Sequence, residues 1–104
     1  MLNESTLLDG NNLVELAKYY ELPAHLVTSM AYYIVQGRPL GDFLRACVSN
    51  DFKEACGRAD SRNIHVLKEI AIFIVQEMPY PCQGSAAKYD AWLVHKAQER
   101  ESAL

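Results

Sequence analysis

Arginines and tyrosines supply the side chains in this sequence that are best suited to binding chemistry. A guanidinium group donates through a planar fork that matches carboxylates and phosphates, and tyrosine rings supply the aromatic area that binding surfaces favour. The stretch from Arg58 to Asn63 also has a purely structural interpretation, because caps and ion pairs that hold a turn use the same residue types. The candidate partner- or ligand-binding residues are Arg38, Arg45, Arg58, Arg62, Tyr32 and Tyr33.

Catalytic and metal-binding patterns are absent from the sequence. It contains no G-x-S-x-G element, P-loop or dinucleotide-binding fingerprint. The three histidines, His25, His65 and His95, fall on separate predicted helices without i, i+4 spacing, and the cysteines include no C-x-x-C pair. We therefore expect no enzymatic activity, no catalytic residue, no bound metal and no cofactor.

The charge balance disfavours two classes of partner. The 104 residues include 13 acidic and 10 basic side chains, a formal net charge of −3, so the whole chain does not attract a phosphate backbone or an anionic membrane. No apolar run approaches the ~18 to 20 residues of a membrane-spanning helix, and the N-terminus lacks the basic and apolar segments of a secretion signal. We expect a cytoplasmic protein without a membrane or nucleic-acid partner.

Helical periodicity runs through most of the chain, and no segment alternates as a strand would. The sequence predicts one all-α domain over residues 1–104, a compact bundle of five to six helices. Residues 1–11 form either a flexible arm or a strap across the core, and 42–57 either two helices or one kinked helix. The predicted helices span residues 13–20, 24–36, 42–48, 51–57, 61–78 and 86–101.

Capping residues set the expected ends of these helices. Gly37 is predicted to take the left-handed conformation after residue 36, and Glu54 is predicted to pair with Arg58 one turn later. The predicted N-caps are Asn12, Asp42, Asp51, Asp60 or Ser61, and Ser85.

Two segments 40 residues apart resemble each other. Residues 25–39 and 65–79 are identical at six of fifteen positions, either by duplication or because buried helices draw on few residue types. Both are strongly apolar. Counting 42–57 as the third helix, we therefore expect the second and fourth helices, 24–36 and 61–78, to form the central pair of the bundle. The face expected to be buried on the fourth helix consists of Ile64, Leu67, Ala71, Ile74 and Val75, widened by Ile70, Ile72 and Phe73.

Several short motifs occur in a fixed order along the chain. They read G-x-P-x-G-x-F-L from Gly37, N-D-x-x-E-A-x-G-R-A-D from Asn50 to Asp60, and Gly84-Ser85 ahead of Trp92. This pattern resembles a group of small phage and prophage proteins of uncharacterised role, over residues 26–94. The resemblance implies a phage or prophage origin and the cytoplasm of a bacterial host, without an activity or a site.

These observations leave three functions of different classes. The leading one is a non-catalytic accessory protein that binds a host or phage protein through a helical face. The first alternative is a sequestering protein that encloses a nucleotide-like small anion between arginines and tyrosines at a dimer seam. The second is a helix-turn-helix DNA-binding regulator, which the carboxylates of Asp51, Glu54, Asp60 and Glu69 disfavour. Apolar residues on several sides of the central helices also lead us to expect a homodimer.

Overall fold

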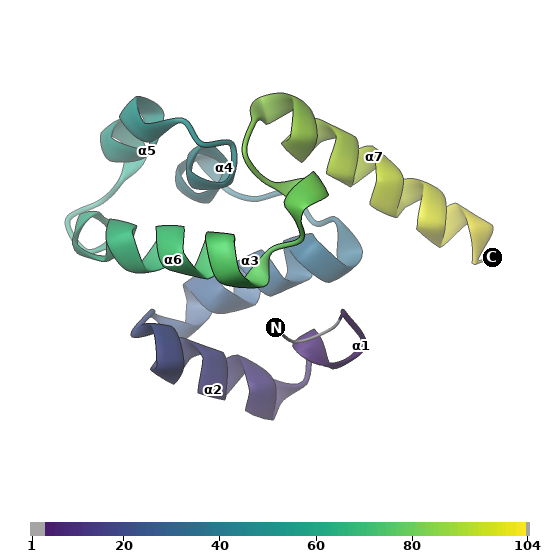
Figure 1. Cartoon of the computed structure of the whole chain (residues 1–104), viewed down its shortest axis with the longest axis horizontal. Coiled ribbons are helices and arrows are strands. Elements are labelled where there is room, and N and C mark those ends of the chain that lie inside the picture. Colours follow the sequence, from purple (N-terminus) through teal and green to yellow (C-terminus); the bar gives the residue numbers. More distant parts are fainter. Residues whose placement is uncertain (1–3, 104) are drawn as a thin grey trace.

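Seven α-helices and two short 3-10 segments make up residues 4–103, the part of the chain that the computed structural model describes. Within this range no strand occurs, so the prediction of an all-α bundle is confirmed. The bundle is flattened, with extents of 42 × 31 × 19 Å, and Figure 1 looks at its broad face, down the shortest axis. The elements are α1 (Glu4–Leu7), α2 (Gly10–Tyr20), α3 (Ala24–Gln36), α4 (Asp42–Val48), α5 (Phe52–Arg58), η1 (Asn63–Val66), α6 (Leu67–Glu77), η2 (Tyr80–Cys82) and α7 (Ala86–Ser102).

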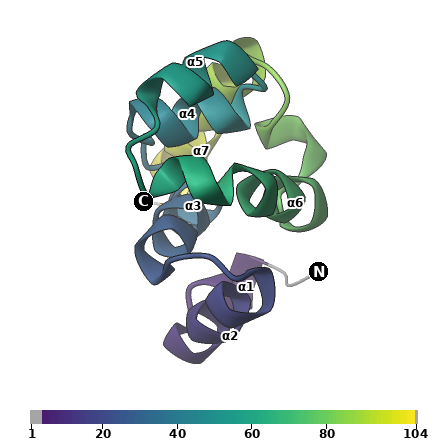
Figure 2. The same ribbon diagram turned by 90° about the vertical axis from the view of Figure 1, so that its left-hand side faces the viewer.

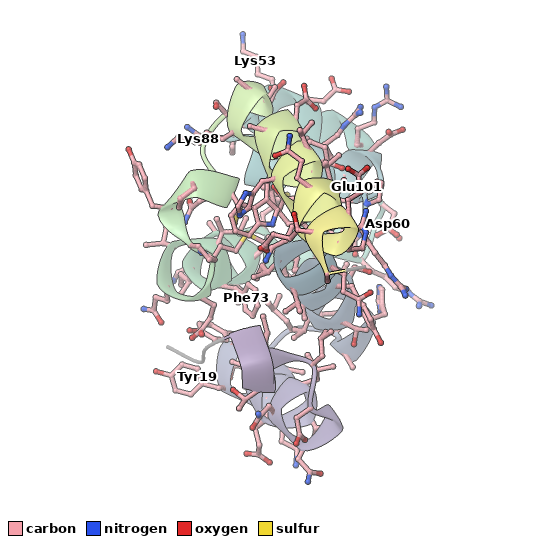
Figure 3. All side chains as sticks on the ribbon, turned by 90° about the vertical axis from the view of Figure 1, so that its right-hand side faces the viewer. Tyr19, Lys53, Asp60, Phe73, Lys88 and Glu101 are labelled. Carbon is pink, nitrogen blue, oxygen red and sulfur yellow. The ribbon has the colours of Figure 1, made fainter. Side chains whose placement is uncertain are left out.

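Helices α3 and α6 supply the deepest part of the core. The main neighbours of α3 are α1, α2 and α7, and those of α6 are α2 and α4, so the two do not form the closely packed central pair that the sequence predicts. Burying one large apolar side chain contributes about 1.5 to 3 kcal/mol to the free energy of folding. Figure 3 shows Phe73 inside the molecule, whereas Tyr19 projects outward from α2. The six largest fully buried side chains all come from these two helices: Tyr33, Phe73, Met30, Ile34, Ile70 and Val27.

The two helices differ in how completely they are covered. Ala31 on α3 is fully buried, but Ala71, its counterpart 40 residues later, is exposed, and 74% of Val75 is open to solvent. The prediction that Ala71 and Val75 lie on a buried face is therefore wrong, and so are the placements of Ile64 and Ile72, which are 41% and 38% exposed. Neighbouring helices therefore cover α6 on the side of Ile70, Phe73 and Ile74 and leave the side of Ala71 and Val75 open to solvent.

Several predicted caps are confirmed. The Asp51 carboxylate accepts a hydrogen bond from the Glu54 backbone N–H at 3.2 Å, and Ser85 Oγ accepts one from the Lys88 N–H at 3.1 Å. Gly37 is left-handed, with φ 68°. Asn50 has φ 60° and separates α4 from α5, which settles the choice between two helices and one kinked helix in favour of two.

Other helix starts differ from the predictions because a neighbouring residue provides the cap. Asp9, not Asn12, caps α2, and its carboxylate accepts from the Asn11 N–H at 2.9 Å. Asp42 lies inside α4, after Gly41. The Asp60 carboxylate does accept from the N–H groups of Arg62 and Asn63, as predicted for a cap, but the first turn after it is the 3-10 segment η1 and not part of an α-helix.

The end of α3 is completed by side chains of α7. The last carbonyl groups of a helix have no partner within it. Trp92 Nε1 donates to the carbonyl oxygens of Tyr33 and Ile34 at 3.1 and 3.2 Å, and the Arg100 guanidinium donates to that of Gln36. We refer to this junction as the α3–α7 clamp.

The N-terminal segment lies across the core as a strap. Helix α1 packs against α3, and Leu7 is only 3% exposed. Asn12 ties the segment to α2, because its side-chain amide donates to the Thr6 carbonyl at 2.7 Å. Residues 1–3 of the predicted arm lie outside the described residues.

Candidate functional site

An apolar groove runs between α4, α5 and α6, on the open side of α6. Figure 2 shows how these three helices are arranged, with α4 and α5 above α6. It encloses about 350 Å³. Each of the three helices contributes an alanine to the lining. The methyl group of alanine is too small to fill the space between the helices, and a hollow remains. The apolar residues that line the groove are Ala46, Ala55, Leu67, Ile70, Ala71 and Ile74. We refer to it as the α4–α6 groove.

Phe52 stands at the edge of the α4–α6 groove with 74% of its surface exposed. It is the first residue of α5, and the cap at Asp51 fixes where that helix begins. Val75, one helical turn after Ala71 on α6, is also 74% exposed. Exposed apolar side chains beside an apolar hollow are the usual mark of an interaction surface on a soluble domain.

The polar residues of the groove are few and of opposite sign. Asp51 and Lys68 line its rim together with the Asn50 amide. Lys68 makes no ion pair with any residue of the described range. The Cys47 thiol also lines the groove, and burial raises the pKa of that thiol to about 11. A partner of the groove therefore meets apolar walls and one charge of each sign.

Two of the predicted arginines meet at one carboxylate. Asp42 lies 3.6 Å from the Arg45 guanidinium and 3.4 Å from that of Arg58. Arg58 also donates to Glu54 at 2.7 Å, as predicted, and this hydrogen bond raises the pKa of the guanidinium. These arginines already have acidic partners, which is how exposed groups that hold helix ends behave.

The remaining candidates lie apart from that pair. The Arg38 guanidinium carbon is 4.4 Å from the centre of the Tyr32 ring, a cation–π contact, and Arg62 is an exposed residue after α5. Tyr33 is fully buried, its hydroxyl donates to the Cys82 carbonyl at 2.7 Å, and its ring stacks on Tyr89. The prediction of Tyr33 as a contact residue is therefore wrong, because its side chain is part of the core.

A second hollow, of about 320 Å³, lies between α4, α5 and the start of α7. Its charged residues are Arg45 and four carboxylates, those of Asp42, Asp51, Glu54 and Asp90. Such a lining attracts cations rather than anions. The arginines at this end of the molecule therefore do not form an anion pocket.

Shallow hollows also lie between α2 and α6, below Tyr19 and Tyr20. The Tyr20 hydroxyl donates to Gln76 at 2.9 Å and to Glu77, and burial is the main cause that raises its pKa. One carboxylate oxygen of Glu69 and one of Glu77 are buried without a hydrogen-bond partner in the described residues. This side joins α2 to α6, and polar and apolar side chains both line its hollows.

No family model, curated protein or solved structure matches the chain. Within residues 4–103, none of the helices combines the length and apolar content needed to cross a bilayer. Over the same range, no three His, Cys, Asp or Glu side chains gather as metal ligands would.

Sequence reasoning missed the α4–α6 groove. Its signal was a set of small residues, Ala46, Ala55 and Ala71, on three predicted helices, together with Phe52 at the polar start of one of them. Helical periodicity shows that a residue shares a face with its neighbours. It does not show that three such faces meet around a space.

Proposed function

We propose that the chain is a non-catalytic binding module that docks a helix of another protein in the α4–α6 groove. The observation that carries this proposal is an apolar hollow of about 350 Å³ bordered by a phenylalanine that is 74% exposed. A folded domain gains nothing from leaving such a side chain in water, whereas a partner that covers it removes roughly 25 cal/mol of unfavourable free energy per Å² of apolar surface.

The shape and lining of the groove favour a helical partner. A volume of about 350 Å³ corresponds to on the order of ten water molecules at about 30 Å³ each, enough for two or three aliphatic side chains. An amphipathic helix presents such side chains at i, i+3 and i+4 and keeps its polar face in water. Asp51 and Lys68 on the rim favour a helix that carries one charge of each sign beside its apolar face.

The biological setting of the proposal rests on the resemblance of the sequence to phage and prophage proteins. In that setting, the module is an accessory factor that occupies a host or phage protein in the bacterial cytoplasm. Binding needs no chemistry at the groove, which matches an apolar lining with few polar groups.

The two alternatives have less support from the described surfaces. Arg45 and Arg58 have acidic partners, and the hollow beside Arg45 has an acidic lining. A nucleotide-like anion or a DNA backbone would therefore meet repulsion there. Thermal-shift measurements with a nucleotide panel test the first alternative. A ligand at 100 times its dissociation constant would stabilise the fold by about 2.7 kcal/mol.

The test of the proposal compares three forms of the tagged chain in capture from a bacterial lysate. Ala71→Glu places a charge in the groove at an exposed helix position, and Val94→Glu places the same charge on α7, where Val94 is 57% exposed. We expect one protein to be retained by the wild type and by Val94→Glu, and to be lost with Ala71→Glu. A photo-crosslinking residue at position 52 should label that protein. Retention that is equal in all three forms would refute the groove as the docking site.

A further inference from the structure

We propose that the α4–α6 groove also binds a second copy of this chain, in a symmetric dimer that inserts Phe52 of each copy into the groove of the other. This inference rests on the proposed function, because it names one partner of the same groove. Its basis is that the groove and the side chain suited to fill it lie next to each other on one face of the molecule.

A twofold axis requires a surface that is complementary to itself. In such a dimer, if residue i of one copy contacts residue j of the other, then j also contacts i. Phe52 is the projecting side chain, and the hollow lined by Leu67, Ile70 and Ile74 accepts it in the other copy. One axis beside the groove therefore forms both contacts at once.

The rim charges satisfy the same requirement. Asp51 and Lys68 both line the groove, and Lys68 has no ion-pair partner among the described side chains. A twofold axis that passes between the positions of Asp51 and Lys68 brings Asp51 of each copy toward Lys68 of the other, which gives two attractive contacts. Two like charges at these positions would have repelled each other across the axis.

A stable dimer needs an extended face around the groove. A stable interface buries about 800 Å² on each partner, which is roughly an eighth of the 6413 Å² surface of this chain. Phe52 alone supplies a large share, because a phenylalanine can bury about 150 to 250 Å². Ala71 and Val75 extend the apolar surface along α6, and the small side chain of Ala71 permits close approach of a second helix.

Sedimentation equilibrium of the untagged chain over a wide concentration range tests the dimer. We expect the mass to rise from 11.7 kDa toward twice that value. Phe52→Ser should weaken association at least tenfold. The matched control Tyr19→Ser, which removes an aromatic ring that is 75% exposed on α2, should leave it unchanged. Circular dichroism of both variants confirms that each is folded.

The rim charges provide a second variant. Lys68→Glu places one carboxylate opposite Asp51 of the other copy at each of the two symmetric contacts, and we expect it to weaken the dimer more at low salt than at high salt. A chain that stays monomeric at every concentration refutes the dimer, and so does a dimer that Phe52→Ser and Lys68→Glu leave unchanged. In both cases the proposed function stands if Ala71→Glu still abolishes capture of another protein. If capture is insensitive to Ala71→Glu, the proposed function fails, whatever the mass of the chain.

Discussion

Replacement of Gly37 by alanine tests the close approach of α3 and α7. Gly37 has φ 68°, and a Cβ atom added there would lie 2.5 Å from the Cβ of Lys96. An L-residue in the left-handed region costs about 1 to 2 kcal/mol, and forcing an extra carbon into a packed contact costs about 1 to 3 kcal/mol. We therefore expect Gly37→Ala to lower the free energy of unfolding by about 2 to 5 kcal/mol.

The measurement is urea denaturation followed by circular dichroism and by tryptophan fluorescence. Trp92 is the only tryptophan of the chain and belongs to the α3–α7 clamp, so its emission reports on the junction directly. The melting temperature should fall by at least ~8 °C, since 1 kcal/mol corresponds to about 4 to 8 °C in a domain of this size.

Two further variants separate the conformational cost from the steric cost. Gly37→Asn carries the same Cβ atom but tolerates the left-handed conformation better than alanine does. If the contact with Lys96 dominates, Gly37→Asn should be almost as unstable as Gly37→Ala. Lys96→Ala should not rescue Gly37→Ala, because alanine retains the Cβ that collides.

Gly57→Ala is the matched control. Gly57 lies within α5 without a positive φ, and nothing stands within 4 Å of a Cβ placed there. Alanine should therefore stabilise the helix by roughly 0.5 to 1 kcal/mol. If Gly37→Ala lowers the free energy of unfolding by less than about 1 kcal/mol, or if both variants lower it equally, then Gly37 and Lys96 do not approach each other closely and the reasoning is refuted.

Three other predictions concern single side chains. Trp92→Phe removes the donor to two helix-end carbonyl groups, and we expect urea denaturation to show a loss of about 1 to 3 kcal/mol; a neutral result would mean that other groups satisfy those carbonyls. The N–H groups of Asn63 and Arg62 lower the pKa of the Asp60 carboxyl below its ordinary value of 3.8. The contribution of this carboxylate to stability is therefore present above pH 3.8 and is lost as the pH falls through the lowered pKa. NMR titration should give a pKa below 3.8, and Asp60→Asn should reduce the acid dependence of the melting temperature. Burial raises the pKa of the Cys47 thiol to about 11, so iodoacetamide at neutral pH should label it much more slowly in the folded chain than in urea, with Cys47→Ser to assign the signal.

Helix positions in this chain are readable from the sequence because their signals are local. Asp51 with Glu54, Gly37 before Pro39, and Ser85 after Gly84 each determine a cap within a few residues. The start of α2 was misplaced because Asp9 and Asn12 are both good N-caps, and periodicity does not choose between them.

Coverage of a helix is not a local property, and the candidate site depends on it. Residues 25–39 and 65–79 have nearly the same apolar pattern, yet Ala31 is enclosed and Ala71 is open. The difference comes from the helices packed around each copy, about which the pattern carries no information. Tyr33 was assigned to a binding surface for the same reason, since its burial depends on Tyr89 and on the segment around Cys82.

The α3–α7 clamp joins residues that lie 58, 59 and 64 positions apart in the sequence. A ribosome releases the N-terminal end first, so α3 exists as a nascent segment well before Trp92 has been synthesised. Until then the Gly37 N–H can satisfy the Tyr33 carbonyl, whereas the carbonyl groups of Ile34 and Gln36 lack their donors from α7 and face water. The chain therefore reaches its native arrangement only after translation of its last helix, and deletion of that helix would destabilise the earlier ones.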